Sequence, residues 1–346
     1  MLVAACGGSG GESGSASVTV VTAATPAPAA VASPTPSPSP TAAPTPAPSP
    51  VAVAVPAAPP VPASWAAGAA ALFDVAPDVP GCKAGTLKAS VKADVLVRLN
   101  AIRALHGLAP VTYSAADDEQ TAQSSLMMAA NGALSHTPPP TWKCHTASGA
   151  TGAGTSNLYG GTVSPFLRWY TDDDYLGGWL IEIGSASLGH RRWMLDPFMG
   201  KVSYGRVSQV LADGSRTDSA SLKVFDFAGG VAAPGGVPPF VAYPYGDYPA
   251  RYMDPAAFLS FSVVAGTTGR SASSGVRFGN ATVAVSANGQ ALAVSSVSHD
   301  NEGFGIPNVI QWKVAGLQSG VTYTVRISGI TGAPVGEYSY QFRLVN

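Results

Sequence analysis

A charge-poor, proline-rich segment near the amino terminus most constrains how this chain can fold. Residues 7–63 contain one acidic residue, Glu12, and no lysine or arginine, and fourteen of the 30 prolines lie between Pro26 and Pro62. Such a segment has few large apolar side chains, so folding could not offset its loss of conformational entropy. Alternating prolines favour extended polyproline II structure. We therefore predict a disordered linker over residues 7–63, Gly/Ser-rich at first and then Pro/Ala-rich, which serves as a stalk or is a plain disordered tail.

The residues before this stalk resemble the end of a bacterial lipoprotein signal peptide. Leu2-Val-Ala-Ala-Cys6 places small residues before a cysteine, as in a lipobox, whose cysteine becomes lipidated. A full signal peptide needs a charged region and an apolar core, which five residues cannot supply. We therefore expect residues 1–6 to be a truncated signal sequence and Cys6 to be the site of lipid attachment. The alternative is a chance cysteine in a stretch of small residues.

Charge and hydropathy exclude two classes of partner. Lys+Arg total 19 and Asp+Glu total 20, and charged residues make up 11% of the 346 residues, so no basic surface for nucleic acid is indicated. We find no apolar run of about 18 residues, the length that a membrane-spanning helix requires. Any membrane association should therefore depend on a lipid at Cys6.

Residues 64–228 read as helices followed by strands. Apolar residues spaced three and four apart from Val91 to Leu105 indicate an amphipathic helix, with Gly107 at its end. Further helices are expected at 114–131, 164–170 and 174–183 and near Ser187, and strands at 201–210 and 221–227. The glycine-rich run 149–154 reads as a flexible loop. This order is typical of an α+β domain.

The C-terminal part reads as a separate all-β domain. Residues 229–239 are rich in Gly and Pro and read as a linker. Over residues 240–346, short β-rich runs are separated by turn signals such as Asn288-Gly289, which predicts a β-sandwich of the immunoglobulin or fibronectin type III class. Tyrosines 243, 245, 248 and 252 are expected to pack where this sandwich docks on the first domain, or else to form a sugar- or protein-binding rim. His106 and His145 read as surface or loop residues.

Several motifs in the first domain resemble the CAP superfamily, which unites cysteine-rich secretory proteins, antigen 5 and plant pathogenesis-related proteins. The resemblance rests on Leu99-Asn-Ala-Ile-Arg103, Leu134-Ser-His136 and Gly189-His-Arg-Arg-Trp-Met-Leu-Asp-Pro197 and covers about residues 88–227. It implies an α-β-α sandwich and secretion. The fold class is thus α+β: a CAP-like α-β-α sandwich and a C-terminal β-sandwich, preceded by the stalk.

The resemblance also implies a cleft that in the family often carries two histidines and two acidic residues. His136 and His190 match the two histidines, and Glu182 matches the acid of a Trp-x-x-Glu pattern. Ser156 stands where the family has the second acid. This departure puts in doubt any activity that needs all four groups.

Three kinds of chemistry are open to such a cleft. The imidazoles of His136 and His190 could hold a divalent metal such as Zn²⁺ or Cu²⁺. Glu182 or a histidine could act as a general base, or Ser156, His190 and Glu182 could form a hydrolase triad, although no Gly-x-Ser-x-Gly turn is present. The third possibility is a polar cleft without catalysis. We predict an exported, lipid-anchored envelope or surface protein that binds a lipid, glycan or protein ligand, with a metal-dependent or His/Glu-based hydrolase as the alternative.

Once Cys6 is assigned to lipid, Cys82 and Cys144 remain. In an exported protein such a pair is expected to form a disulfide, whereas a cytosolic protein would hold two free thiols. The bond would join the segment before the first long helix to the loop after His136.

Overall fold

The structure is a computed structural model that describes residues 54–225 and 237–346. The predictions for Cys6, for residues 7–53 of the stalk and for most of the linker at 229–239 therefore lie outside the described residues. None of the described helices is long and apolar enough to cross a membrane.

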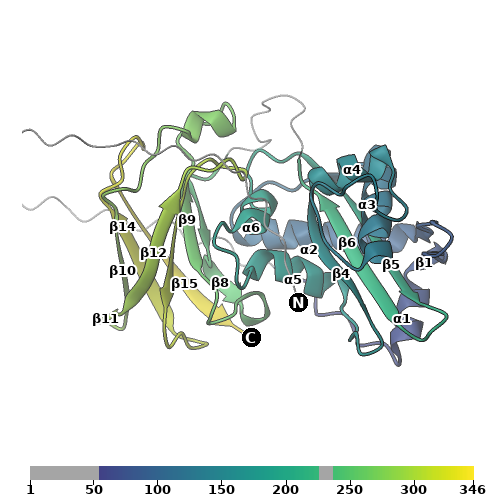
Figure 1. Cartoon of the computed structure of the whole chain (residues 1–346). Coiled ribbons are helices and arrows are strands. Elements are labelled where there is room, and N and C mark those ends of the chain that lie inside the picture. The colour runs from purple at the N-terminus through teal and green to yellow at the C-terminus, as the bar shows by residue number, and fades with distance from the viewer. Residues whose placement is uncertain (1–53, 226–236) are drawn as a thin grey trace, which may run out of the picture.

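The first domain is a sheet between two layers of helices (Figure 1), as the sequence predicted. The sheet has the strand order β3-β5-β6-β4, in which β3 runs parallel to β5 and the other pairs are antiparallel. Helices α3 and α4 cover one face, and α2, α5 and α6 cover the other. The bounds are α2 Ala89–Leu105, β3 Thr112–Tyr113, α3 Asp118–Asn131, α4 Ala147–Gly154, β4 Ser156–Ser164, α5 Asp172–Ile181, α6 Gly189–Met194, β5 Lys201–Val210 and β6 Arg216–Lys223. Smaller elements are α1 Trp65–Ala71, β1 Phe73–Val75, β2 Thr86–Leu87 and η1 Ala115–Asp117.

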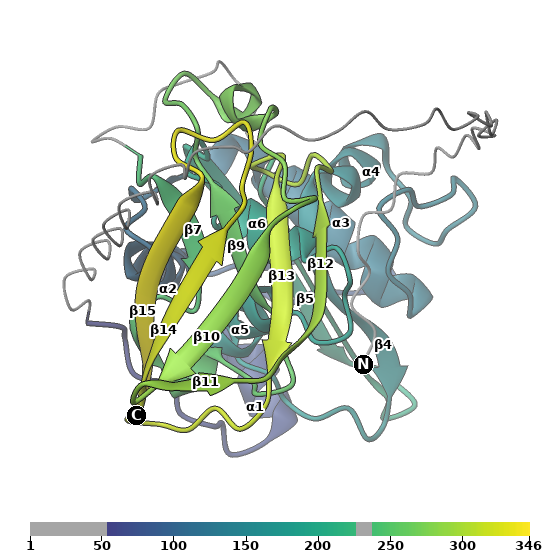
Figure 2. The same ribbon diagram turned by 90° about the vertical axis from the view of Figure 1, so that its left-hand side faces the viewer.

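The second domain is a β-sandwich, which confirms that prediction (Figure 2). One sheet has the order β11-β10-β14-β15-β8 and the other β12-β13-β9-β7. The bounds are β7 Phe240–Tyr243, β8 Gly246–Pro249, η2 Ala250–Tyr252, β9 Leu259–Val263, η3 Arg270–Ser273, β10 Thr282–Ala287, β11 Gln290–Leu292, β12 Val294–Asp300, β13 Val309–Val314, β14 Thr322–Ser328 and β15 Glu337–Val345. Asn288 and Gly289 both have positive φ and join β10 to β11 in the predicted tight turn.

Small residues and hydroxyls let helix α3 lie directly on the sheet. A Cβ atom at Gly205 would lie 2.3 Å from the carbonyl carbon of Thr121, so only glycine fits this approach. Buried hydroxyls then bond across the narrow gap: Ser125 donates to the carbonyl of Gly205 at 3.0 Å, and Thr217 donates to that of Ala129 at 2.9 Å. These bonds satisfy polar groups that burial would otherwise penalise.

Two expected elements were wrong. The run 149–154 belongs to helix α4, not to a loop, because its glycines let it pack against α3: a Cβ at Gly152 would lie 2.1 Å from the carbonyl oxygen of Gln120. The segment 164–170 is not a helix. Phe166 is 90% exposed, whereas Trp169 and Tyr170 pack against the core from an irregular segment. In addition, the strand expected at 221–227 begins earlier, at Arg216, and ends at Lys223.

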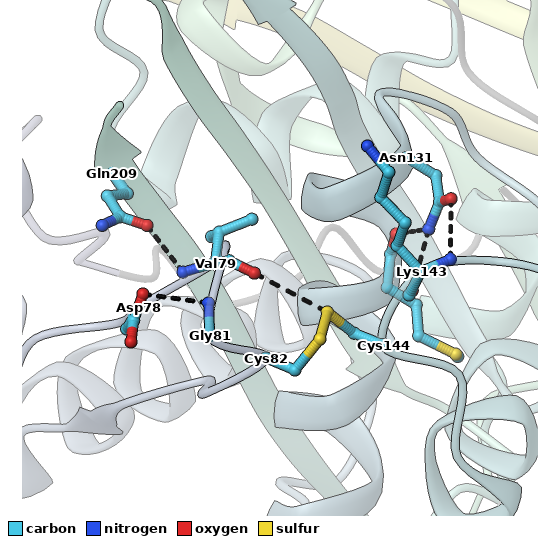
Figure 3. The surroundings of a disulfide bond; sticks show 9 residues. Asp78, Val79, Gly81, Cys82, Asn131, Lys143, Cys144 and Gln209 are labelled. Carbon is cyan, nitrogen blue, oxygen red and sulfur yellow. Dashed lines mark hydrogen bonds between the residues drawn. A yellow bond between two sulfur atoms is a disulfide. The ribbon is translucent and has the colours of Figure 1, made fainter. Parts of the chain in front are cut away.

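Cys82 and Cys144 form the predicted disulfide, with their Cα atoms 5.2 Å apart (Figure 3). Asn131, at the end of α3, fixes the neighbouring chain: its side chain accepts from the amide of Lys143 and donates to the carbonyl of the same residue, each at 3.0 Å. The bond therefore ties the segment before α2 to a loop that α3 already holds.

The layer of α2, α5 and α6 lies between the first domain's sheet and the β-sandwich (Figure 1), and one continuous hydrophobic cluster runs through both domains. Tyr243, Tyr248 and Tyr252 are each at most 1% exposed, so they pack at the junction rather than form an exposed rim. His106 is also buried there, contrary to our expectation of a surface residue. Its Nδ1 donates to the carbonyl of Ala242 at 2.7 Å. Burial, the largest cause, lowers the pKa of His106 to about 3.

Candidate functional site

The end of helix α5 places Glu182 against the first turn of α6. Glu182 follows the last residue of α5 in the left-handed conformation, with φ of 55°, and is 1% exposed. One carboxylate oxygen accepts from the ring Nδ1 of His190 at 3.0 Å and from its amide at 3.2 Å. The other oxygen accepts from the amide of Arg191 at 3.0 Å. Glu182 thus accepts hydrogen bonds from amides in the first turn of α6, which have no acceptor within the helix itself.

These contacts keep Glu182 ionised. Burial alone would raise the pKa of its carboxyl, but the hydrogen bond and charge of His190 and the contacts to Arg191 outweigh it, and the pKa lies below its ordinary value of 4.5. A carboxylate accepts only, so His190 must carry a proton on Nδ1. The other ring nitrogen, Nε2, is buried and has no hydrogen-bond partner among the described residues.

We predict that Glu182 makes the protein acid-sensitive. Its pKa is lowered in the folded state, so between that pKa and about 4.5 the unfolded chain binds more protons, and stability falls as the pH falls. The contribution is fully present above the unfolded pKa. In Glu182→Gln this part of the pH dependence should vanish, which chemical unfolding between pH 3 and 7 would measure. An unchanged slope would contradict the assigned ionisation.

His136 faces His190 from the loop after α3. The two ring centroids are 6.5 Å apart. The Nδ1 of His136 donates to the carbonyl of Ala153, at 2.8 Å, and the residue is only partly buried. His136 therefore lies on the solvent side of His190, which is 3% exposed.

Ser156, the residue in the place of the family's second acid, begins strand β4. Its chain neighbour Asn157 donates a side-chain hydrogen bond to the carbonyl of His190 at 3.1 Å. Ser156 is 4% exposed, and its hydroxyl has no hydrogen-bond partner among the described residues. The hydroxyl and His190 Nε2 are therefore not bonded to each other, and the serine–histidine bond that a hydrolase triad requires is not formed.

The nitrogen and oxygen atoms of His136, His190 and Glu182 offer few ligands to a divalent metal. Both Nδ1 atoms are donors, so only the Nε2 atoms of His136 and His190 could act as ligands. Both oxygens of Glu182 already accept hydrogen bonds. Within residues 54–225 and 237–346, no three His, Cys, Asp or Glu side chains gather into a ligand group. A protein zinc site normally has at least three such ligands, so these residues do not fit a resident metal.

Sequence reasoning missed the roles of Arg191 and Arg192, which it used only as part of a motif. Arg191 is 1% exposed and donates to the carbonyls of Leu180 and Ile181, at 2.6 and 2.7 Å, at the end of α5. It also donates to the β-sandwich, at the carbonyl of Phe258 and the hydroxyl of Ser260, at 2.9 and 3.1 Å. The sequence did contain a signal for these roles: two adjacent arginines in a largely apolar run need hydrogen-bond acceptors if they are buried.

Arg192 makes a second link to the β-sandwich. It pairs with Asp300 at 2.8 Å and donates to the carbonyl of Glu302 at 2.7 Å. The part of α6 that follows His190 is therefore held by the second domain as well as by the first.

The acidic run at the start of α5 is fully engaged. Asp172 pairs with Arg206 at 2.9 Å, Asp173 accepts from Tyr252 at 2.5 Å, and Asp174 forms a capping box with Thr171. These carboxylates serve the fold and do not form a cation site.

Comparison with known families places part of the first domain. Residues 96–209 match the family model described as CAP, the cysteine-rich secretory protein family. The match includes all four cleft residues. Searches of curated proteins and of solved structures found no match.

Proposed function

We propose, on the premise that residues 96–209 form a CAP domain, that the chain is an exported protein whose CAP cleft binds an envelope ligand without turning it over. The ligand is a lipid, a glycan or a protein with a polar group that reaches the cleft. The disulfide supports export, since such bonds persist in oxidising compartments. Lipid anchoring through Cys6, which lies outside the described residues, is part of the same proposal.

The observation that carries the proposal is a pair of buried polar atoms without partners. The Nε2 of His190, whose ring centroid lies 6.5 Å from that of the partly exposed His136, has no hydrogen bond among the described residues, and neither has the hydroxyl of Ser156. Buried polar atoms in native proteins are nearly always satisfied. A ligand hydroxyl or amide could donate to Nε2 and accept from the serine.

The same contacts argue against catalysis. A general acid or base must exchange a proton with substrate, but both oxygens of Glu182 are occupied by donors from His190 and Arg191. Among residues 54–225 and 237–346, no base lies within hydrogen-bond distance of the serine hydroxyl. These contacts support ligand binding by His190 and Ser156 rather than activation of a nucleophile.

Ser156→Ala separates binding from stability. The change removes a buried hydroxyl without a partner, so the free energy of unfolding should stay the same or rise by up to about 1 kcal/mol. Ligand binding should weaken by at least about tenfold, because one of two polar contacts is lost. Ser124→Ala is the matched control: it breaks a formed bond, with Ser221 at 2.8 Å, and should destabilise the protein without changing affinity.

Calorimetric titration of the full chain with muropeptides from purified peptidoglycan, and with phosphatidylglycerol vesicles, would supply the affinities. Saturable binding of one probe, weakened by Ser156→Ala but not by the control, is expected. Loss of stability in Ser156→Ala with unchanged binding would contradict the proposal. For the anchor, we expect the intact mass of membrane-extracted protein to include a lipid on Cys6 and a Cys6→Ser variant to leave the membrane fraction.

The alternative is a metal-dependent hydrolase. One observation favours it: both histidines donate through Nδ1, so in the neutral form each has an unprotonated Nε2 that could bind a metal. Thermal melting with Zn²⁺ or Cu²⁺, beside His136→Ala, tests it. A bound metal at one hundred times its dissociation constant would add about 2.7 kcal/mol. A shift that disappears in the variant would favour the alternative.

A further inference from the structure

A pocket of about 600 Å³ lies where the two domains meet, along helix α5. We call it the α5 groove. Its floor includes Gly177 and Gly178, where the helix carries no side chain. Tyr159 and Tyr170 line it from the first domain, and Tyr252 lines it from the β-sandwich. The groove shares Glu182 with the site described above but includes neither His136 nor His190, and the inference below does not rest on the proposed function.

One wall of the α5 groove is a proline-rich segment of the chain itself. Ala58, Pro59 and Val61 line the pocket, and residues 54–62 form neither helix nor strand. The carbonyl of Pro56 accepts from Arg251 at 2.5 Å, and that of Ala57 accepts from Arg98 at 2.9 Å. The protein thus already binds one extended proline-rich segment here, through arginine donors from both domains.

The rest of the groove offers the same chemistry without an occupant from the described chain. Arg168 is exposed and stacks on the ring of Tyr170 at 4.4 Å, and it pairs with no carboxylate among the described residues. Arg251 stacks on Tyr252 at 4.6 Å. The rim is apolar, with Val61 85% exposed and Ile183 54% exposed. The pocket therefore combines aromatic rings, hydrogen-bond donors and apolar edges.

Charge narrows the class of ligand. Three carboxylates, Asp173, Asp174 and Glu182, share the pocket with two arginines. Each carboxylate already accepts a hydrogen bond within the protein, from Tyr252, Thr171 and His190 respectively, so the lining does not favour a cation. A proline-rich segment is neutral. It has carbonyl acceptors but few N–H donors, and its rings pack on aromatic side chains, as in known polyproline II grooves.

We propose that the α5 groove binds an uncharged, proline-rich segment of a partner molecule in extended conformation, beside the chain's own residues 54–62. Tyr170 supplies the stacking surface and Arg168 the donor to a backbone carbonyl. The segment comes from another molecule, because the chain's own residues 54–62 already form one wall of the groove.

The test uses the full chain and a dye-labelled synthetic peptide, Ser-Pro-Thr-Pro-Ser-Pro-Ser-Pro, the sequence of residues 33–40. Fluorescence anisotropy should show saturable binding, and a peptide with alanine at each proline should not bind. Tyr170→Ala and Arg168→Gln should each weaken binding, the first by about tenfold, whereas Tyr170→Phe should retain it. Phe166→Ala is the matched control, since Phe166 is 90% exposed, lies close in sequence and does not line the pocket.

Three results would overturn the proposal. The first is that the labelled peptide binds neither the wild-type chain nor a variant in which alanine replaces the prolines between residues 33 and 50. The second is binding that Tyr170→Ala and Arg168→Gln leave unchanged. The third is that the peptide binds the variant without these prolines but not the wild-type chain. The chain's own prolines would then compete for the groove, and its occupant would not be a segment of a partner molecule. Failure here would leave the His136–His190 proposal unaffected, because the two sites share neither of the mutated residues.

Discussion

Arg191→Ala should lower the free energy of unfolding by about 3–5 kcal/mol, because loss of the guanidinium leaves buried carbonyl acceptors without donors. The carbonyls of Leu180, Ile181 and Phe258 all accept from its guanidinium, which also stacks on Tyr243 at 3.8 Å. Burying polar groups without partners is among the largest single-residue effects. Chemical unfolding, followed by tryptophan fluorescence, measures the change.

Comparison with Ser260→Ala shows how much the hydrogen bond between the domains contributes to the free energy of unfolding. Ser260 contributes one of the bonds to Arg191, at 3.1 Å, so its loss should cost only about 1 kcal/mol. Arg326→Ala, which removes an exposed ion pair with Glu337, should have no measurable effect. An Arg191→Ala protein as stable as the wild type would show that these buried contacts do not hold the site.

Removal of the disulfide should have an effect of similar size. With Cys82 and Cys144 both replaced by serine, the loop-entropy model for a separation of 62 residues gives a loss of about 4 kcal/mol. This value is an upper figure, because Asn131 holds the loop next to Cys144 through bonds that the change leaves in place. The thermal midpoint should fall accordingly.

A reducing agent provides the control for the disulfide. Reduction of the wild type should lower its midpoint to that of the double variant, and the variant itself should not respond. If the wild type melts at the same temperature with and without the reducing agent, while Ellman's reagent shows that reduction has freed two further thiols, the bond does not stabilise the fold.

Local patterns predicted much of the fold. The apolar spacing from Val91 to Leu105 gave helix α2 to within two residues at its start, and Asn288-Gly289 marked the β10–β11 hairpin. Both depend on neighbours in sequence. The run 149–154 failed for the opposite reason: its helix depends on contact with Gln120 and Ser124 of α3, which no local pattern reports.

The site was predicted only in part. The family resemblance selected His136, Glu182 and His190, which the structure brings to within hydrogen-bond or ring-contact distance. It did not indicate that Glu182 would cap α6 or that Arg191 would reach the second domain. Those roles depend on which carbonyls and amides lie nearby in space, and spacing along the chain does not encode this.

The central claim is that the CAP cleft binds a ligand without turnover, and product analysis tests it most directly. The full chain would be incubated with the muropeptide mixture or the phosphatidylglycerol vesicles at a concentration that saturates binding, and the mixture analysed by mass spectrometry over many hours. We predict that the bound probe is recovered intact, while Ser156→Ala binds it weakly. Product that accumulates with the wild type and is abolished in Glu182→Gln would contradict the account and identify an enzyme.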